Sequence, residues 1–537
     1  MLLKDALGIL SKSSPYAVTT SGKPADPLVE KIKNYLFVKT DIECAFEGKL
    51  KSIKEEKLKR NTSSDIIFLC GSSGDGKSEI LTRYSSDYAN DIEFHLDATH
   101  SFEPKKTAIE TLNERFTKHR ESDKALVVGI NIGMLANFER EGDDSHAEVK
   151  KAISDYLNNK DTNNKYTFLN FESFPKFKIL DGEVSSNFFQ SLLDRVVRDD
   201  SGNHFRDLYN NCVASGNDKQ LVANFALLRN RFVQKVIVEL LLGARIRKDQ
   251  FITARMLLDF IYCILTGPGY LFDNLFDGGD NELLAALVDF DPSIIRNKKL
   301  DLFILHRNLD FEDKAYSVFI DEIKIKYGVP KKLTPQSAIR LFYLLKYTSQ
   351  DNNYHYDFRD SFNEESQTLY KTVWEQHKNY SGESSDKKKL RRFYDDIIYT
   401  AINKHANRNA PYLSKDEFYI SSHNGCDLAS EMELSVVYKS IESDEGTDLA
   451  AFNVYLEVNE HRLPLVPVGV NLLALMIGIV GGYRPNKHDK NSIVLLDELV
   501  AKISEMASLS DVLYLYSEGQ RIKLKANADN EIRVSGL

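Results

Sequence analysis

The segment Gly71–Ser78, here called the glycine loop, constrains the fold most strongly, because its sequence GSSGDGKS fits the pattern G-x-x-x-x-G-K-S. A continuous apolar run, Ile66–Cys70, precedes it, and residues 78–84 have a helical pattern. This pattern binds phosphate where it joins a buried strand to a helix. The glycines let backbone N–H groups approach phosphate oxygens, and the positive end of the helix adds attraction. The loop therefore predicts a site for ATP or GTP; the alternative is a glycine turn formed by chance.

The residues around the loop have expected roles in holding a nucleotide with Mg²⁺. Lys77 is expected to neutralise the β- and γ-phosphates, and the Ser78 hydroxyl to ligate Mg²⁺. Such a site also needs a carboxylate at the end of a neighbouring strand, and the best candidate is Asp97, 20 residues after Lys77. Its alternative role is to cap the following turn or helix. The predicted metal ligands are thus Ser78 and Asp97, and the predicted nucleotide-binding residues are Gly71, Ser72, Ser73, Gly74, Asp75, Gly76, Lys77, Ser78 and Glu79.

Apolar runs alternate with helical patterns from Asp65 onward, which predicts a parallel α/β sheet. The expected fold is therefore an AAA+-like P-loop NTPase core with a helical lid, a mostly helical region after it, and a small terminal β-sheet. The expected strands are residues 66–70, 92–96, 125–130 and 166–171. The expected domains are an N-terminal helical segment (1–60), the P-loop core (61–182), a helical lid-like subdomain (183–268), a helical domain (269–420) and a mixed α/β domain (421–537).

Two further polar residues are placed to act in catalysis beside Lys77 and Asp97. Asn131 follows the third predicted strand, at the sheet edge where ligands bind, and is expected to contact the γ-phosphate or the attacking water. Its alternative role is to satisfy a loop. Arg255 opens an apolar helix of the lid-like subdomain, from which its guanidinium could reach the phosphates. Arg245 and Arg247 are weaker candidates for this role or as fingers donated to a neighbouring subunit, and a surface ion pair is the alternative for each arginine.

Two apolar segments have competing interpretations. Residues 493–498 (IVLLDE) look like a strand ending in Asp497 and Glu498, which is the pattern of a catalytic acid. Apolar residues recur at helical spacing through residue 506, so we predict a helix with an acidic face instead. Residues 463–480 approach the length of a membrane span, but Pro464, Pro467 and Gly469 leave room for only about a dozen helical residues. A buried core helix after an extended piece is expected, and no membrane contact.

Composition limits the possible partners and the compartment. A net charge of −9 argues against a protein that coats nucleic acid, so any DNA contact must be a local patch. The five cysteines form no C-x-x-C pair and the N-terminus has no signal-peptide pattern, so a cytoplasmic protein with reduced thiols is expected. The densest basic run either holds DNA phosphates or forms a solvated helix face. It consists of Lys387, Lys388, Lys389, Arg391 and Arg392.

Three segments together resemble the DptF (DndF) family, the ATPase component of bacterial DNA phosphorothioation-dependent restriction systems. They are residues 68–81 (FLCGSSGDGKSEIL), 95–102 (HLDATHSF) and 128–135 (VGINIGML). The chain length and the late segment 482–486 (GYRPN) are also consistent with this family. The resemblance implies an ATPase that works with two partners, the G and H proteins of the same system, to attack DNA that lacks sulfur in its backbone. ATP and Mg²⁺ are the expected cofactors, and an oligomer is possible.

Three functions remain to be compared. The leading hypothesis is an ATP-hydrolysing motor or switch that drives DNA restriction with partner proteins. The alternative is a nucleotide-gated signalling or scaffold protein of the AAA+/STAND type, which binds ATP but barely hydrolyses it. This alternative rests on the residue that follows Asp97, which is alanine and not glutamate. Activation of the attacking water needs a base or a positioning group, which alanine cannot supply. A small-molecule kinase is disfavoured by the large helical remainder and the lack of an acceptor-site motif.

Overall fold

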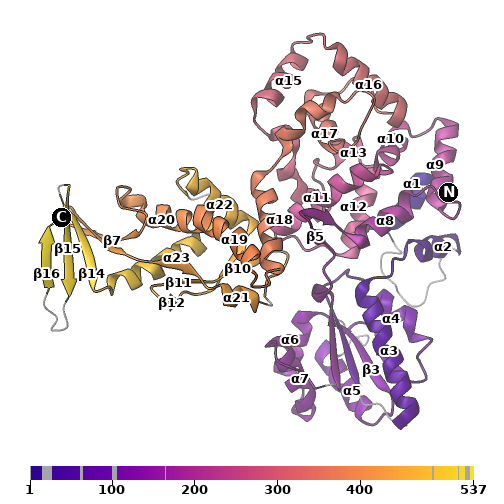
Figure 1. Cartoon of the computed structure of the whole chain (residues 1–537). Helices are drawn as coiled ribbons and strands as arrows, with labels where there is room; N and C mark the ends of the chain where they lie inside the picture. The colour runs from indigo at the N-terminus through magenta and orange to yellow at the C-terminus, as the bar shows by residue number, and fades with distance from the viewer. Residues whose placement is uncertain are drawn as a thin grey trace. The chain divides into compact units, whose positions relative to one another are not determined.

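The computed structural model describes residues 2–14, 27–60, 65–98, 106–163, 165–444, 446–486, 489–517, 519–526 and 532–536 (Figure 1). The chain divides into two compact units. Unit 1 consists of Met1–Lys178, Ser185–Leu242 and Phe251–Phe362. Unit 2 consists of Asn363–Leu537 together with two short segments, Ile179–Val184 and Gly243–Gln250. The second unit is therefore assembled from three separate stretches of the sequence.

Unit 1 contains a four-stranded parallel sheet with the strand order β2-β3-β1-β4. Its strands are β1 (Ile66–Cys70), β2 (Ile92–His95), β3 (Ala125–Ile130) and β4 (Tyr166–Asn170). The central strand β1 pairs with β3 on one side and with β4 on the other. The prediction of a parallel α/β sheet is confirmed, and each of its four strands ends within one residue of the predicted boundary.

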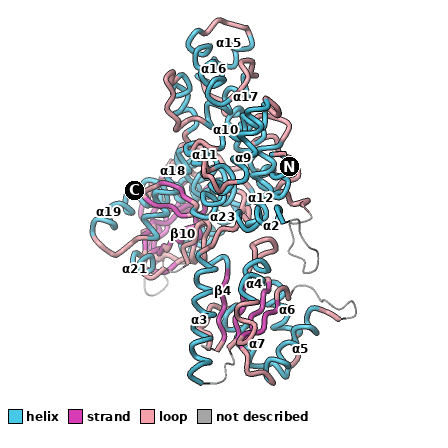
Figure 2. The backbone as a smooth tube through the Cα atoms, turned by 90° about the vertical axis from the view of Figure 1, so that its right-hand side faces the viewer, coloured by secondary structure: helices cyan, strands magenta, loops and turns pink. Residues whose placement is uncertain are grey.

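Helices cover both faces of this sheet (Figure 2). One face packs against α3 (Asp41–Arg60) and α4 (Lys77–Ser85), and the other against α5 (Ala108–Arg120), α6 (Ile132–Glu141) and α7 (Ala147–Leu157). Successive residues of a strand point to opposite faces, so a strand covered on both sides must be apolar throughout. This explains the continuous apolar runs in the sequence.

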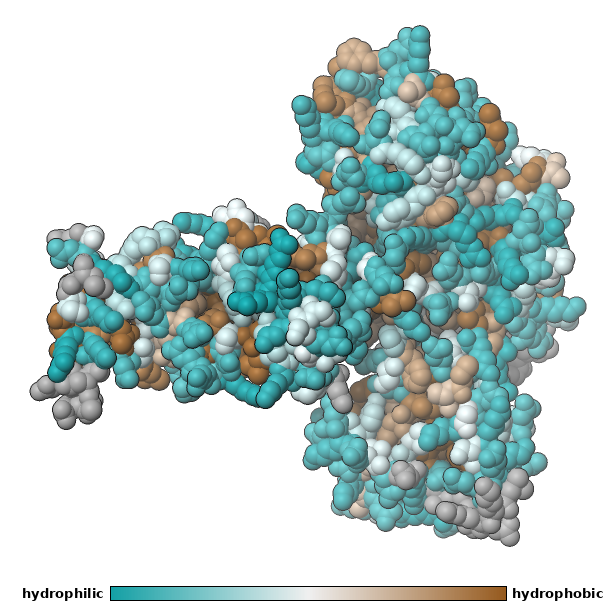
Figure 3. Space-filling model, viewed as in Figure 1, coloured by the Kyte–Doolittle hydropathy of each residue, from teal (hydrophilic) through white to brown (hydrophobic). Residues whose placement is uncertain are grey.

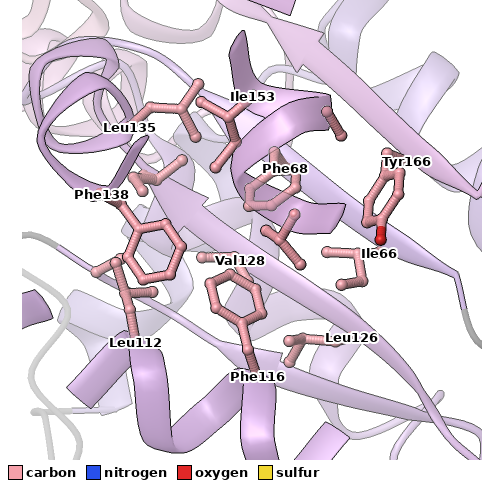
Figure 4. Packing of buried hydrophobic residues seen from close by; sticks show 14 of the residues in the cluster. Ile66, Phe68, Leu112, Phe116, Leu126, Val128, Leu135, Phe138, Ile153 and Tyr166 are labelled. Carbon is pink, nitrogen blue, oxygen red and sulfur yellow. The ribbon is translucent and has the colours of Figure 1, made fainter. Parts of the chain in front are cut away.

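Aliphatic and aromatic side chains together fill the layer between the sheet and α5 to α7 (Figure 4). Phe68 of β1 packs beside Phe116 of α5, with ring centroids 6.2 Å apart, and Phe116 meets Phe138 of α6 at 5.0 Å. On the opposite face, α3 contributes Phe46 and Leu50 to the core. Helix α3 lies in residues 1–60, which were predicted to form a separate N-terminal helical segment. It packs on the sheet and so forms one layer of the α/β core that was predicted for residues 61–182.

The rest of unit 1 is helical. Residues 187–266, which lie within the predicted helical subdomain 183–268, form five helices, and a turn at Arg229 and Asn230 separates the third from the fourth. The Asn230 side chain accepts a hydrogen bond from the N–H of Phe232 at 2.9 Å and so starts the new helix. The helices are α1 (Leu3–Leu7), α2 (Pro27–Leu36), α8 (Asn187–Val197), α9 (His204–Ser215), α10 (Lys219–Leu228), α11 (Arg231–Arg247), α12 (Ala254–Thr266), α13 (Leu271–Asn274), α14 (Glu282–Leu287), α15 (Lys298–Asn308), α16 (Lys314–Tyr327) and α17 (Pro335–Leu344).

Unit 2 combines helices with antiparallel strands. Its helices are α18 (Glu365–Lys378), α19 (Ser384–Phe393), α20 (Thr400–Ala406), α21 (Tyr438–Glu442), α22 (Val470–Val480) and α23 (Lys490–Ser508), with a π-helical stretch at Tyr394–Tyr399 between α19 and α20. Its strands are β5 (Lys178–Leu180), β6 (Glu183–Ser185), β7 (Glu417–His423), β8 (Cys426–Glu431), β9 (Leu434–Val436), β10 (Ala451–Val454), β11 (Leu456–Val458), β12 (His461–Arg462), β13 (Val466–Gly469), β14 (Val512–Ser517), β15 (Gln520–Ala526) and β16 (Ile532–Gly536).

The largest sheet of unit 2 is antiparallel, with the order β16-β15-β14-β8-β7. The predicted antiparallel sheet at the end of the chain is confirmed as β14 to β16, whereas β7 and β8 were not predicted. The apolar segment 463–480 forms β13 followed by the 11-residue α22, which confirms an extended piece before a short buried helix. Among the described residues, no helix combines the length and the apolar character that a membrane crossing requires. On the face shown in Figure 3, hydrophobic residues appear as small separate patches among hydrophilic ones.

Candidate functional site

The glycine loop leaves the carboxyl end of β1 and enters α4. Gly74 and Gly76 have φ angles of 88° and 100°, in the left-handed region that favours glycine. Gly71 is needed for a different reason: a Cβ atom there would lie 2.7 Å from the ring of Phe171. The three glycines therefore allow a backbone path and a close approach that other residues would disturb.

Lys77 begins α4, and its side chain folds back over the loop. Its Nζ donates hydrogen bonds to the carbonyl oxygens of Gly71 and Ser72, both at 2.8 Å. The pKa of the Lys77 ammonium lies below its usual value, because the effect of burial exceeds the opposite effect of the nearby carboxylates of Asp75 and Asp97. The ammonium is thus held among loop carbonyls, and oxygens of an anionic ligand could replace these carbonyls as its partners.

Asp75 braces the loop from within. Its Oδ2 accepts a hydrogen bond from the N–H of Ser72 at 2.8 Å, and its Oδ1 lies 3.1 Å from the Nζ of Lys176. Both Lys176 and Phe171 follow β4, so the chain after this strand supports the loop. The sequence indicated Asp75 only as a member of the loop. Lys176, 101 residues farther along the chain, was missed because no local pattern links the two.

The end of β2 approaches α4 across the neighbouring strand β3. The Ser78 hydroxyl donates to the carbonyl of Leu96 at 3.5 Å, and the Ala98 N–H donates to the carbonyl of Gly129 at 2.8 Å. Gly129 makes this approach possible, because a Cβ atom there would lie 2.6 Å from the Leu96 carbonyl oxygen. Asp97 therefore comes into the vicinity of Ser78 and Lys77. No local pattern in the sequence marks Gly129 for this role.

Asn131 lies at the carboxyl end of β3 and caps α6. Its Oδ1 accepts a hydrogen bond from the N–H of Met134 at 2.6 Å. This bond is the loop-satisfying role that the sequence offered as the alternative. Because the carbonyl of the side chain is used in the cap, Nδ2 is the group of Asn131 that can donate to a phosphate or to water.

The start of α12 contacts the loop. The Arg255 N–H donates to the carbonyl of Gly74 at 3.2 Å, and a Cβ atom at Gly74 would lie 3.2 Å from both Arg255 Cβ and Thr253 Oγ1. Thr253 caps the helix by accepting from the N–H of Met256 at 3.3 Å. The N-termini of α4 and α12 therefore both lie at the glycine loop, where their partial positive charges favour an anion.

The weaker arginine candidates form ion pairs in unit 2. Arg245 lies 2.6 Å from Asp249, and Arg247 pairs with Glu364. The rival acid Asp497 lies on helix α23, as predicted, where it accepts a hydrogen bond from His405 at 2.8 Å. Residues 99–102 of the family-like segment 95–102 lie outside the described residues.

The basic run of residues 387–392 lies on helix α19 and is partly paired. Arg391 and Arg392 lie 3.5 and 3.3 Å from Asp395 and Asp396, one helical turn farther on. Their side chains are 75% and 88% exposed, so these pairs are weak and both guanidinium groups remain accessible. Lys387 lies over the Tyr438 ring, and Lys389 lies 3.5 Å from Asp386.

A scan against protein-family models, a search of curated proteins and a search of solved structures each returned no match for this chain.

Proposed function

We propose that the chain is a P-loop ATPase of AAA+-like architecture that binds its nucleotide at Gly71–Ser78. The observation that carries the proposal is the position of the Lys77 ammonium, 2.8 Å from the carbonyl oxygens of Gly71 and Ser72, in a loop between a buried parallel strand and a helix. A cation in this position suits the β- and γ-phosphates of a nucleotide. The two helix N-termini at the loop also support an anionic ligand.

Ser78 and Asp97 fit the metal that accompanies such a nucleotide. Mg²⁺ prefers oxygen ligands and is usually bound by one or two protein groups together with phosphates and water. When bound, Mg²⁺ neutralises charge that develops on the phosphates. Ser78 offers a hydroxyl and Asp97 a carboxylate, and Arg255 on the first turn of α12 offers a second cation for the phosphates. Nδ2 of Asn131 can orient water or the γ-phosphate.

We further propose that the ATPase serves a bacterial restriction system that attacks DNA lacking phosphorothioate modification, together with G and H partner proteins. The support is the resemblance to the DptF (DndF) family, whose segments include the glycine loop, Asp97 and Asn131. Lys387, Lys388, Lys389, Arg391 and Arg392 on α19 are the residues proposed to contact DNA directly.

A second candidate is a nucleotide-gated switch that binds ATP and hydrolyses it very slowly. Two observations favour it: the Asn131 carbonyl is engaged in capping α6, and a buried alanine, Ala98, follows Asp97 in place of a glutamate. Activation of water needs a base or a positioning group, and neither Ala98 nor the engaged carbonyl of Asn131 supplies one.

Steady-state hydrolysis separates the two candidates. The purified chain is assayed with ATP and with GTP, alone and then with unmodified duplex, phosphorothioated duplex and the partner proteins. The restriction ATPase predicts turnover that unmodified duplex and the partners stimulate. Nucleotide binding without turnover under every condition supports the switch, and absence of binding contradicts both.

A further inference from the structure

Two short segments of unit 2, Ile179–Val184 and Gly243–Gln250, interrupt the sequence of unit 1. Each of them lies a few residues from a residue of unit 1 that is close to the glycine loop. The first segment, Ile179–Val184, starts three residues after Lys176, which pairs with Asp75 of the loop. The second segment, Gly243–Gln250, ends three residues before Thr253, whose hydroxyl would meet a Cβ atom at Gly74. The glycine loop therefore contacts the residues just before the first segment and the residues just after the second.

Within unit 2, helix α18 contacts both segments. Glu375, in its last turn, accepts hydrogen bonds from the backbone N–H groups of Asp181 and Gly182, at 2.7 and 3.0 Å. Glu364, at the N-cap position, forms an ion pair with Arg247. The Arg247 carbonyl also accepts a hydrogen bond from Asn471 of α22 at 2.8 Å.

The contact at Glu375 is suited to a firm attachment. Asp181 and Gly182 both have positive φ angles, 52° and 71°, so the two turn N–H groups of the β5–β6 hairpin point to one side. One ionised carboxylate accepts both, and hydrogen bonds to a charged acceptor are stronger than neutral ones. These two hydrogen bonds therefore tie the β5–β6 hairpin to α18.

We propose that α18 senses whether the glycine loop holds a nucleotide, through Asp75, Lys176 and the β5–β6 hairpin; this rests on the proposed nucleotide site. When a phosphate accepts hydrogen bonds from the Lys77 ammonium, the bonds from this ammonium to the carbonyls of Gly71 and Ser72 break. The Ser72 N–H is bound to Asp75, whose other oxygen pairs with Lys176, so a rearrangement of the loop reaches the hairpin, which begins two residues after Lys176. The contact of α12 with Gly74 acts in the same way on the second segment.

Hydrogen exchange of a peptide covering residues 179–186 tests the proposal, because it contains the two amides held by Glu375. The full chain is measured with and without Mg²⁺ and a non-hydrolysable ATP analogue, as wild type, Lys176→Met and Lys178→Met. Lys178 is the matched control, since it is the first residue of β5 in the same hairpin, but its Nζ lies 3.9 Å from Asp41 and its side chain is 57% exposed. Binding of a fluorescent nucleotide is measured on every variant.

The nucleotide is expected to slow exchange of this peptide about threefold in wild type and in Lys178→Met, because an ordered loop reduces local opening of the chain attached to it. In Lys176→Met the nucleotide still binds and the slowing is lost. Bound nucleotide with unchanged exchange in wild type overturns the relay alone, as does undiminished slowing in Lys176→Met. If wild type binds no nucleotide, the proposed function fails with it.

Discussion

Substitution of Gly129 by alanine is expected to disable the site without touching any residue proposed to contact the nucleotide. A Cβ atom at this position would lie 2.6 Å from the Leu96 carbonyl oxygen and 2.8 Å from Leu81 Cδ1. The side chain of Leu81 can rotate, but the carbonyl belongs to the backbone. To regain ordinary contact, the chain at Leu96 must move by roughly 0.5–1 Å, and it must carry Asp97 with it.

Two magnitudes follow from this displacement. Overpacking of a buried position costs about 1–3 kcal/mol of folding free energy. A displacement of about 1 Å at a reacting centre lowers turnover by roughly 100-fold. Gly129→Ala should therefore unfold at a lower temperature and hydrolyse ATP about 100-fold more slowly than wild type, while its Lys77 still supports nucleotide binding.

Gly133→Ala is the matched control, since Gly133 lies four residues later on α6. Its Cβ atom would meet only the Asn131 Oδ1, at 3.6 Å, which is an ordinary contact. Alanine in a helix is about 0.5–1 kcal/mol more favourable than glycine, so this variant should be as stable as wild type or slightly more so. The assays are a thermal melt and steady-state ATP hydrolysis. Wild-type turnover and melting in Gly129→Ala would refute the argument that this glycine admits Leu96 and places Asp97.

Three further variants test separate parts of the account. Asp97→Asn should keep nucleotide affinity within about threefold and lower Mg²⁺-dependent turnover roughly 100-fold; unchanged turnover would remove Asp97 from the site. Burial lowers the pKa of His95 to about 4, so the stability it contributes is present above its unfolded pKa of about 6.5 and is lost as the pH falls toward 4. Between pH 7 and 5, the free energy of unfolding should therefore fall by about 2 kcal/mol less in His95→Gln than in wild type, as measured by urea titration. The same pH dependence in both proteins would contradict the lowered pKa of His95. Arg391→Gln combined with Arg392→Gln should reduce the slope of log binding constant against log salt for duplex DNA by about 1–2, whereas an identical slope would place the DNA elsewhere.

Much of the α/β core could be predicted because its signals are local. Residues 66–70 and 125–130 are apolar throughout, which a strand buried on both faces requires, and the glycine loop follows one of them directly. The left-handed φ angles of Gly74 and Gly76 agree with the same pattern. Strand order was not contained in these signals, because it depends on which strands meet after the connecting helices have folded back.

The missed features depend on contacts between distant residues. Lys176 meets Asp75 across 101 residues, and Gly129 matters only because Leu96 passes over it. Strand β8 pairs with β14, more than 80 residues later, and the alternation of apolar and polar residues in its sequence CDLASE stops after the third residue. Non-local pairing of this kind leaves no periodic pattern in either segment alone.

The most direct test of the central claim is equilibrium binding of Mg²⁺-ATP to wild type and to Lys77→Ala, with Lys178→Ala as a control for loss of a lysine elsewhere. The account predicts saturable binding by wild type and the control, and at least about 100-fold weaker binding by Lys77→Ala, because a cation bonded to the phosphates contributes roughly 3 kcal/mol or more. Equal affinity in all three proteins would show that the glycine loop is not the nucleotide site.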